Sequence, residues 1–285
     1  GSSSVAKRVH VPSIIIGLTI VAMGTSLPET AVSVSASITG NNELAVSNVV
    51  GSNIFNLMVV IGVCAMIATV NVAKETIKRD IPFSLICAGL LLILGILGVG
   101  DKSGMMLGHF DGVIFIGAFA GYIFYMIRIA LKANKEGKKV EIEGGSDEDI
   151  KLVSVPVSIL FIVGGAIAIA VGGDVTVDAA SRIASDLGMS QTLVGLTIVS
   201  IGTSLPELVT SVTAARKGNA GIAIGNIVGS NIFNILFVIG TAALICSVPF
   251  ERKFIIDTII AVLSGILLWG GTIKKKELRK PCGIL

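Results

Sequence analysis

Residues 17–62 read GLTIVAMGTSLPETAVSVSASITGNNELAVSNVVGSNIFNLMVVIG, and residues 195–240 read GLTIVSIGTSLPELVTSVTAARKGNAGIAIGNIVGSNIFNILFVIG. The two copies align without a gap at an offset of 178 residues, and 28 of the 46 aligned pairs are identical. The identities gather in two motifs, GTSLPE and GSNIFN, which are the least lipid-like parts of either copy. A polar motif that is kept twice in an apolar chain indicates a functional site.

The rest of the chain has the composition of a membrane protein. Of its 285 residues, 53% are hydrophobic and 14% are charged, and the mean hydropathy is +0.90, which excludes an ordinary soluble domain. Strands of a membrane β-barrel would alternate over about 10 residues, and these apolar runs do not alternate. We therefore expect an all-α integral membrane protein, because the apolar runs reach the roughly 20 residues that a spanning helix needs. The expected helices lie at 13–38, 44–70, 81–99, 111–133, 152–174 or on to 186, 191–215, 221–247 and 254–272.

The offset between the copies also predicts the domain organisation. The first residues of the chain align with Ala179–Gly188, but the apolar segment 152–174 has no counterpart in the first half. We expect two inverted five-helix repeats, a ten-helix arrangement of which about eight spans are present and the first and last helices are missing. Residues 1–133 form the first repeat, 134–151 a cytoplasmic linker loop, and 152–285 the second repeat.

Basic residues predict how the two copies cross the membrane. Eighteen of the 22 Lys and Arg residues fall in alternate loops, which places those loops in the cytoplasm. Lys7 and Arg8 precede the first GTSLPE motif, whereas Arg216 and Lys217 follow the second one. The copies are therefore expected to run in opposite directions, and inverted repeats with interrupted helices are a transporter architecture.

The motif residues offer oxygen atoms to a ligand. In GTSLPE, two hydroxyls and a carboxylate share one helix face, and Pro28 and Pro206 should open the helix at Gly24 and Gly202 and free backbone oxygens. In the following helix an amide, a hydroxyl and a second amide recur at every fourth residue. Carboxylate, hydroxyl, amide and carbonyl oxygens suit hard cations such as Na⁺ and Ca²⁺, and suit zinc or copper poorly. The polar side chains concerned are Thr25, Ser26, Glu29, Asn48, Ser52 and Asn56, with Thr203, Ser204, Glu207, Asn226, Ser230 and Asn234 as their counterparts.

The two glutamates carry the functional interpretation. A carboxylate deep in a membrane span costs about 2.5–3.5 kcal/mol or more unless something pairs with it. No Lys, Arg or His lies at a matching depth in the expected spans, so Glu29 and Glu207 should meet a mobile cation or a proton. Asp80 and Asp257 are expected to cap helix starts. Small polar residues usually mediate helix packing, and that role is expected for Ser33, Ser35, Ser37, Thr210, Ser211 and Thr213.

The doubled pair of GTSLPE and GSNIFN motifs resembles the α-repeats of the sodium/calcium exchanger branch of the calcium/cation antiporter superfamily. The resemblance covers both repeats and implies a ten-helix fold with the ion sites between four broken helices. It implies that the cations bind side chains of both copies and backbone oxygens near Ala22 and Ser200. The implied ligands are Thr25, Ser26, Glu29, Ser52, Asn56, Thr203, Ser204, Glu207, Ser230 and Asn234.

The resemblance implies a transporter and not an enzyme. The expected function is secondary antiport of Na⁺ against Ca²⁺ by alternating access, in a multi-pass protein of the plasma membrane. The expected partners are the two ions and the lipid bilayer, without a cofactor, nucleic acid or protein partner. Some relatives carry Asp where Asn234 stands, which leaves potassium co-transport and the sodium stoichiometry open. The alternatives are a proton/calcium antiporter, whose motif has Gly-Asn-Ala where Gly-Thr-Ser stands here, a passive cation channel, and a membrane sensor without transport.

Overall fold

The computed structural model describes residue 4 and residues 12–40, 42–98, 105–135, 154–188 and 200–279. Each of the eight segments expected to be helical contains helix among the residues that the structure describes. The linker expected at 134–151 lies outside these residues, apart from its first two positions, which end a helix. The first four segments are α2–η1–α3–α4, α5–η2–α6, η3–α7 and α8; the bounds are α2 (Ser13–Ile16), η1 (Gly17–Val21), α3 (Ala22–Thr25), α4 (Leu27–Ile38), α5 (Asn42–Phe55), η2 (Asn56–Val60), α6 (Ile61–Ile67), η3 (Thr76–Asp80), α7 (Ile81–Leu97) and α8 (His109–Lys135).

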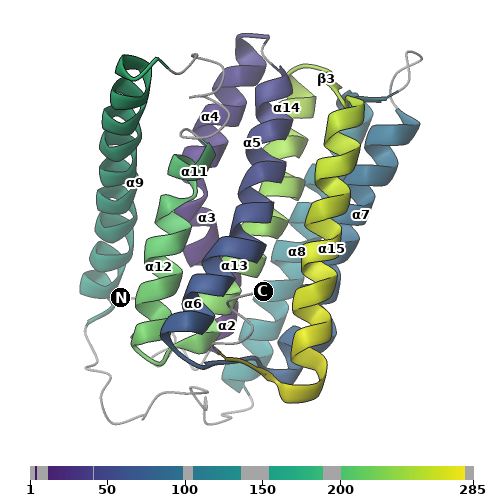
Figure 1. Cartoon of the computed structure of the whole chain (residues 1–285). Helices are drawn as coiled ribbons and strands as arrows, with labels where there is room; N and C mark the ends of the chain where they lie inside the picture. The colour runs from purple at the N-terminus through teal and green to yellow at the C-terminus, as the bar shows by residue number, and fades with distance from the viewer. Residues whose placement is uncertain are drawn as a thin grey trace.

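The second half repeats this order after one additional long helix, α9 (Val155–Asp186). The helices that follow are α11 (Ser200–Thr203), α12 (Leu205–Arg216), α13 (Ala220–Phe233), η5 (Asn234–Ile239), α14 (Gly240–Ile245) and α15 (Arg252–Lys275). Figure 1 shows α2 to α4 rising and α11 to α12 descending, so the two GTSLPE helices run in opposite directions. The inversion expected from the loop charges is therefore present in the fold.

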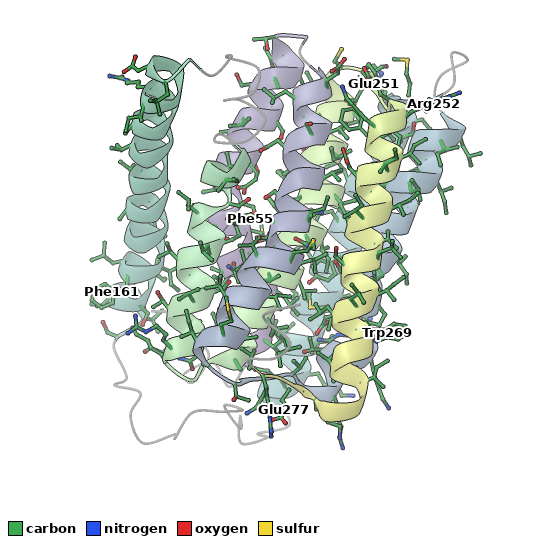
Figure 2. The ribbon with its side chains drawn as sticks, viewed as in Figure 1. Phe55, Phe161, Glu251, Arg252, Trp269 and Glu277 are labelled. Carbon is green, nitrogen blue, oxygen red and sulfur yellow. The ribbon has the colours of Figure 1, made fainter. Side chains whose placement is uncertain are left out.

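The helices have the length and surface of membrane spans. Within the described residues, five helices are long and apolar enough to cross a bilayer, and the bent pair Ser13–Thr25 and Leu27–Ile38 makes a sixth. Large apolar side chains cover the outside of the bundle; Phe161 of α9 is 57% exposed and Leu267 of α15 is 74% exposed. Figure 2 shows Phe161 at the outer edge, and places Glu251 and Glu277 at the two opposite ends of α15. The protein is thus an all-helical membrane protein whose apolar surface faces lipid.

The GSNIFN helix of the second copy forms the centre of the bundle. In the span Ala220–Ile245, 94% of an apolar stretch of 18 residues is buried inside the protein. Helix α13 packs on α2, η1 and α3 on one side and on α12 and α7 on others, while α9 stands at the edge against α11, α12 and α3 (Figure 1). Both motifs of both copies therefore meet in the interior.

Glycines allow α13 to approach the first GTSLPE helix at backbone distance. A Cβ atom on Gly225 would lie 2.7 Å from the carbonyl oxygen of Ile14, and one on Gly229 would lie 2.6 Å from that of Leu18. A Cβ on Gly17, in the facing helix, would lie 2.9 Å from the carbonyl oxygen of Ile222. Close contact of this kind needs small residues on the facing surfaces, and it holds the polar residues of the two helices within hydrogen-bonding reach.

Two short strand pairs fasten the ends of the bundle. β1 (Val70–Asn71) pairs with β4 (Glu277–Leu278), and β2 (Met106–Leu107) pairs with β3 (Val248–Pro249), both antiparallel. β1 follows α6 and β3 follows α14, and these are equivalent points of the two copies. The pairs lie at opposite ends of α15 (Figure 1), so each end of the bundle joins a segment of one copy to a segment of the other.

The expectation that Asp80 and Asp257 cap helix starts is wrong. The helix runs without a break from Thr76 to Leu97, and Asp80 lies inside it with helical dihedral angles and without a capping hydrogen bond. Its carboxylate is buried and pairs with the neighbouring guanidinium of Arg79. Asp257 lies more than one turn inside α15. The first of these helices begins at Thr76 and not at 81, and α15 begins at Arg252 and not at 254, so both acidic residues lie further inside their helices than the apolar pattern predicts.

Candidate functional site

The proline of each GTSLPE motif marks a helix break, as the sequence predicts. α3 ends at Thr25, Ser26 leaves helical geometry with φ −86° and ψ 13°, and α4 restarts at Leu27 with Pro28 in its first turn. The two halves of this span meet at an angle of 48°. In the second copy Ser204 separates α11 from α12 in the same way, with φ −89° and ψ 1°. Proline suits the first turn of a helix because no hydrogen bond is required there from its nitrogen.

Each break places a glutamate inside the protein. Glu29 and Glu207 lie in the first turn of α4 and α12, and both side chains are 0% exposed. Neither takes part in any ion pair formed within the described residues. Two buried carboxylates without a basic partner are costly in a membrane interior, so a bound cation or a proton is needed to neutralise them.

The hydroxyls around each carboxylate come from both copies. Ser52 and Ser204 donate to Oε1 of Glu29 at 3.0 and 3.2 Å. Ser26 and Ser230 donate to Oε1 of Glu207 at 2.7 and 3.2 Å. The hydroxyls of Ser52 and Ser204 are themselves 2.6 Å apart. The two motifs of the first copy and the two of the second therefore build a single site.

The threonines of the motifs connect this site to the asparagines Asn48 and Asn226. Thr203 donates to Oδ1 of Asn48 at 3.2 Å, and Thr25 donates to Oδ1 of Asn226 at 3.0 Å. The amide of each asparagine in turn donates to a serine hydroxyl, Asn48 to Ser33 at 3.1 Å and Asn226 to Ser211 at 3.0 Å. Ser33 and Ser211 thus fix the helices to one another, in agreement with the packing role expected for them.

The two asparagines expected as ligands, Asn56 and Asn234, begin the π-helical segments η2 and η5. Segments of this kind are rare and are frequently found at functional sites. Asn56 donates its amide to Oδ1 of Asn231 at 3.1 Å, and Asn234 donates to Oδ1 of Asn53 at 3.2 Å. Both side chains are 0% exposed.

Among the residues that the structure describes, four buried side-chain oxygens at this site have no hydrogen-bond partner: Oε2 of Glu29, Oε2 of Glu207, Oδ1 of Asn56 and Oδ1 of Asn234. All four belong to residues that the sequence predicts for the cation site. Buried acceptors are almost always satisfied in folded proteins. Four such atoms at one site, two of them on carboxylates, fit an oxygen-coordinated cation.

The structure gives less support to the backbone oxygens near Ala22 and Ser200 that are expected to bind a cation. The carbonyl oxygen of Ala22 accepts hydrogen bonds from the backbone of Ser26 at 3.0 Å and from the hydroxyl of Thr25 at 3.2 Å. Ser200 opens α11, and its side chain lies outside the described set. The role of these two positions stays a prediction.

Comparison with known proteins agrees with the motifs. A family model described as sodium/calcium exchanger protein matches residues 1–128 and 157–284. This chain belongs to the sodium/calcium exchanger family. The chain is 39% identical over 245 residues to the putative antiporter CaxA of Alkalimonas amylolytica, covering 86% of this chain and 74% of CaxA. It is 30% identical over 273 residues to the inner membrane protein YrbG of Escherichia coli, covering 94% and 82%.

A solved structure shows the same fold. The sodium-calcium exchanger NCX_Mj, in a crystal soaked with Na⁺ and Ca²⁺, superposes on this exchanger with a TM-score of 0.81 and 29% sequence identity. The superposition covers 100% of this chain and 86% of NCX_Mj. The expected fold, membrane location and transporter class are therefore confirmed for this exchanger.

Sequence reasoning missed two polar residues of the candidate site, Asn53 and Asn231. Both are identical members of the GSNIFN motif, so the repeat itself contained the signal. They escape a search by spacing because they lie outside the four-residue interval of Asn48, Ser52 and Asn56. In the structure each donates to the backbone of the opposite copy and accepts from a ligand asparagine.

Proposed function

We propose that this exchanger is a secondary active antiporter that moves Na⁺ and Ca²⁺ in opposite directions across the plasma membrane. The observation that carries the proposal is the set of four unpartnered buried oxygens on Glu29, Glu207, Asn56 and Asn234. Two carboxylates give the site a formal charge of about −2, which one Ca²⁺ neutralises. The likeness to NCX_Mj, a sodium-calcium exchanger by name, supports the same assignment.

Competition for one set of ligands would couple the two fluxes. Ca²⁺ takes six to eight oxygen ligands, about 2.3–2.6 Å away. Glu29 and Glu207 would each contribute a carboxylate to Ca²⁺, with Asn56 and Asn234 adding amide oxygens. Sodium ions would use the same carboxylates together with the hydroxyls of Ser52, Ser230 and their neighbours, so the two cations cannot bind at once.

The proposed ligands are closed off from solvent in this conformation. Glu29, Glu207, Ser52, Ser230, Asn56 and Asn234 are all 0% exposed. Exchange therefore requires a rearrangement that opens the site to one side of the membrane at a time. Inverted repeats provide for this, because movement of helices around a fixed central site can expose that site to either side.

The direct test uses purified exchanger, in its full-length form, reconstituted in liposomes. An outward Na⁺ gradient is expected to drive uptake of ⁴⁵Ca²⁺, and K⁺ in place of internal Na⁺ should remove the uptake. Equal ⁴⁵Ca²⁺ uptake with and without the Na⁺ gradient would refute Na⁺/Ca²⁺ antiport. A pH gradient that drives uptake without Na⁺ would instead support proton/calcium antiport. Uncoupled currents far above carrier rates would support a channel.

The serine at each helix break donates its hydroxyl to the glutamate of the opposite copy. Removing this hydroxyl is expected to weaken Ca²⁺ binding. Ser26→Ala and Ser204→Ala each delete a hydrogen bond to a buried carboxylate and leave that oxygen less well placed. A hydrogen bond to a charged group contributes about 1.5–3 kcal/mol, so the apparent Ca²⁺ affinity should fall about tenfold or more. The measurement is the Ca²⁺ concentration that gives half-maximal Na⁺-driven uptake.

Ser37→Ala is the matched control for both serine variants. Ser37 is also buried, but its hydroxyl donates to the backbone oxygen of Ser33, away from both carboxylates. Its Ca²⁺ affinity should stay within about threefold of the parent protein. If Ser37→Ala weakened Ca²⁺ binding as much as Ser26→Ala, the hydroxyls of the breaks would have no special role.

A further inference from the structure

We infer that Asn53 and Asn231 are positioning residues of the cation site. Each fixes the orientation of the ligand asparagine in the opposite copy, so that this ligand turns its amide oxygen, and not its amide nitrogen, toward the cation. The inference rests on the proposed function, because the orientation matters only if a cation binds there.

Two backbone carbonyl oxygens fix the orientation of the side-chain amides of Asn53 and Asn231. The side-chain nitrogen of Asn53 donates to the carbonyl oxygen of Asn231 at 3.3 Å, and that of Asn231 donates to the carbonyl oxygen of Asn53 at 3.4 Å. A carbonyl oxygen can only accept a hydrogen bond. The nitrogen of each amide must therefore face that carbonyl, which leaves Oδ1 to accept from the residue three positions further along the same opposite helix.

The fixed amides of Asn53 and Asn231 in turn fix the orientation of the amides of Asn234 and Asn56. Oδ1 of Asn53 meets the side chain of Asn234 at 3.2 Å, and Oδ1 of Asn231 meets that of Asn56 at 3.1 Å. Since Oδ1 only accepts, Asn234 and Asn56 must present nitrogen to it. Their own oxygens then point away from the pair, and these are the two unpartnered amide oxygens of the site.

The pair is enclosed, so nothing else competes for these bonds. Asn53 and Asn231 are 3% and 2% exposed. Both side chains border a cavity of about 20 Å³, whose other lining residues are mostly apolar and come from α7, α15 and the helices of the pair itself. A reversed ligand amide would present an NH₂ group to the cation, and this group has no lone pair to offer. The asparagine pair therefore keeps the site composed of oxygen alone.

The test compares one substitution in two backgrounds. Asn53→Leu keeps the number and branching of the side-chain heavy atoms but removes the acceptor for Asn234, whereas alanine would enlarge the cavity and admit water. It is expected to lower the Ca²⁺ affinity about tenfold or more, since Asn234 loses its fixed orientation. In an Asn234→Asp background the same change should alter the affinity by less than about threefold relative to Asn234→Asp alone, because both carboxylate atoms are oxygen.

The symmetric pair provides an independent repetition. Asn231→Leu should lower the Ca²⁺ affinity with Asn56 present and have little effect in an Asn56→Asp background. Affinities come from equilibrium binding of ⁴⁵Ca²⁺ to the purified full chain, with the melting temperature recorded for each variant. Val228→Ala is the packing control. Val228 is buried beside the same cavity without a polar contact, so its substitution should lower the melting temperature and leave the Ca²⁺ affinity unchanged.

The outcomes separate this inference from the proposed function. Absence of Na⁺-driven ⁴⁵Ca²⁺ uptake by the parent protein would refute the proposed function itself. If the parent protein transports, an equal loss of affinity in the asparagine and aspartate backgrounds would show that Asn53 and Asn231 act through packing, and would overturn the inference alone. No loss of affinity in the asparagine background would overturn it as well.

Discussion

Glu29→Gln and Glu207→Gln are each expected to abolish Na⁺-driven uptake of Ca²⁺. Either change halves the negative charge of a site that has no basic partner among the described ion pairs. A unit charge at about 4 Å contributes about 4 kcal/mol at the effective dielectric of a protein, so binding should fall at least about 100-fold. The two variants should be equally inactive, because the carboxylates occupy equivalent positions with equivalent serine partners.

Reconstituted ⁴⁵Ca²⁺ uptake measures this effect, and Glu251→Gln is the matched control. Glu251 lies at one end of α15 (Figure 2), where its exposed carboxylate pairs with Lys253. An exposed pair of this kind contributes about 0–1 kcal/mol, so uptake should be retained. Parental uptake by Glu29→Gln or Glu207→Gln would remove these residues from the site.

Gly225→Ala combined with Gly229→Ala is expected to disrupt the fold of the membrane core. The added Cβ atoms would lie 2.7 and 2.6 Å from backbone carbonyl oxygens of the first GTSLPE helix, which cannot rotate away as a side chain can. Overpacking of a well-filled core costs about 1–3 kcal/mol for each site. The helices must separate, so both the melting temperature in detergent and Ca²⁺ uptake should fall sharply.

Gly117→Ala in α8 is the control for the glycine variant. A Cβ atom there meets nothing within 4 Å, and alanine is favoured over glycine in a helix by about 0.5–1 kcal/mol. This variant should melt at the parental temperature or above it. A double Gly225/Gly229 variant that melted like Gly117→Ala would show that the close contact does not stabilise the protein.

Much of the fold and of the site is predictable from the sequence because of the repeat. The offset of 178 residues by itself pairs Glu29 with Glu207, and the basic residues around each copy predict the inversion. Pro28 and Pro206 predict the helix breaks, since proline has no amide hydrogen and clashes with the preceding turn. The fold adds what these rules cannot provide, namely which oxygens remain without a partner.

The misassigned residues show where local rules fail. Asp80 is expected to cap a helix, because acidic residues favour helix starts, but Thr76–Asp80 forms a π-helical turn that continues into α7. Asn53 escapes notice because its partners, Asn231 and Asn234, lie about 180 residues away in the sequence. Contacts between copies depend on how two helices cross, and periodicity within one helix contains no information about this.

The reciprocal asparagine contacts also explain where the two halves of the gene have stayed alike. Each contact from one copy to the other occurs again with the copies exchanged, which is the contact pattern of a symmetric homodimer. A mutation of Asn53 alone would disturb Asn234, which the other half encodes, just as a mutation of Asn231 alone would disturb Asn56. The two copies of GSNIFN therefore depend on each other: a change at Asn53 or Asn231 is tolerated only together with a change in the other copy, such as Asn234→Asp or Asn56→Asp, that makes the amide orientation unimportant.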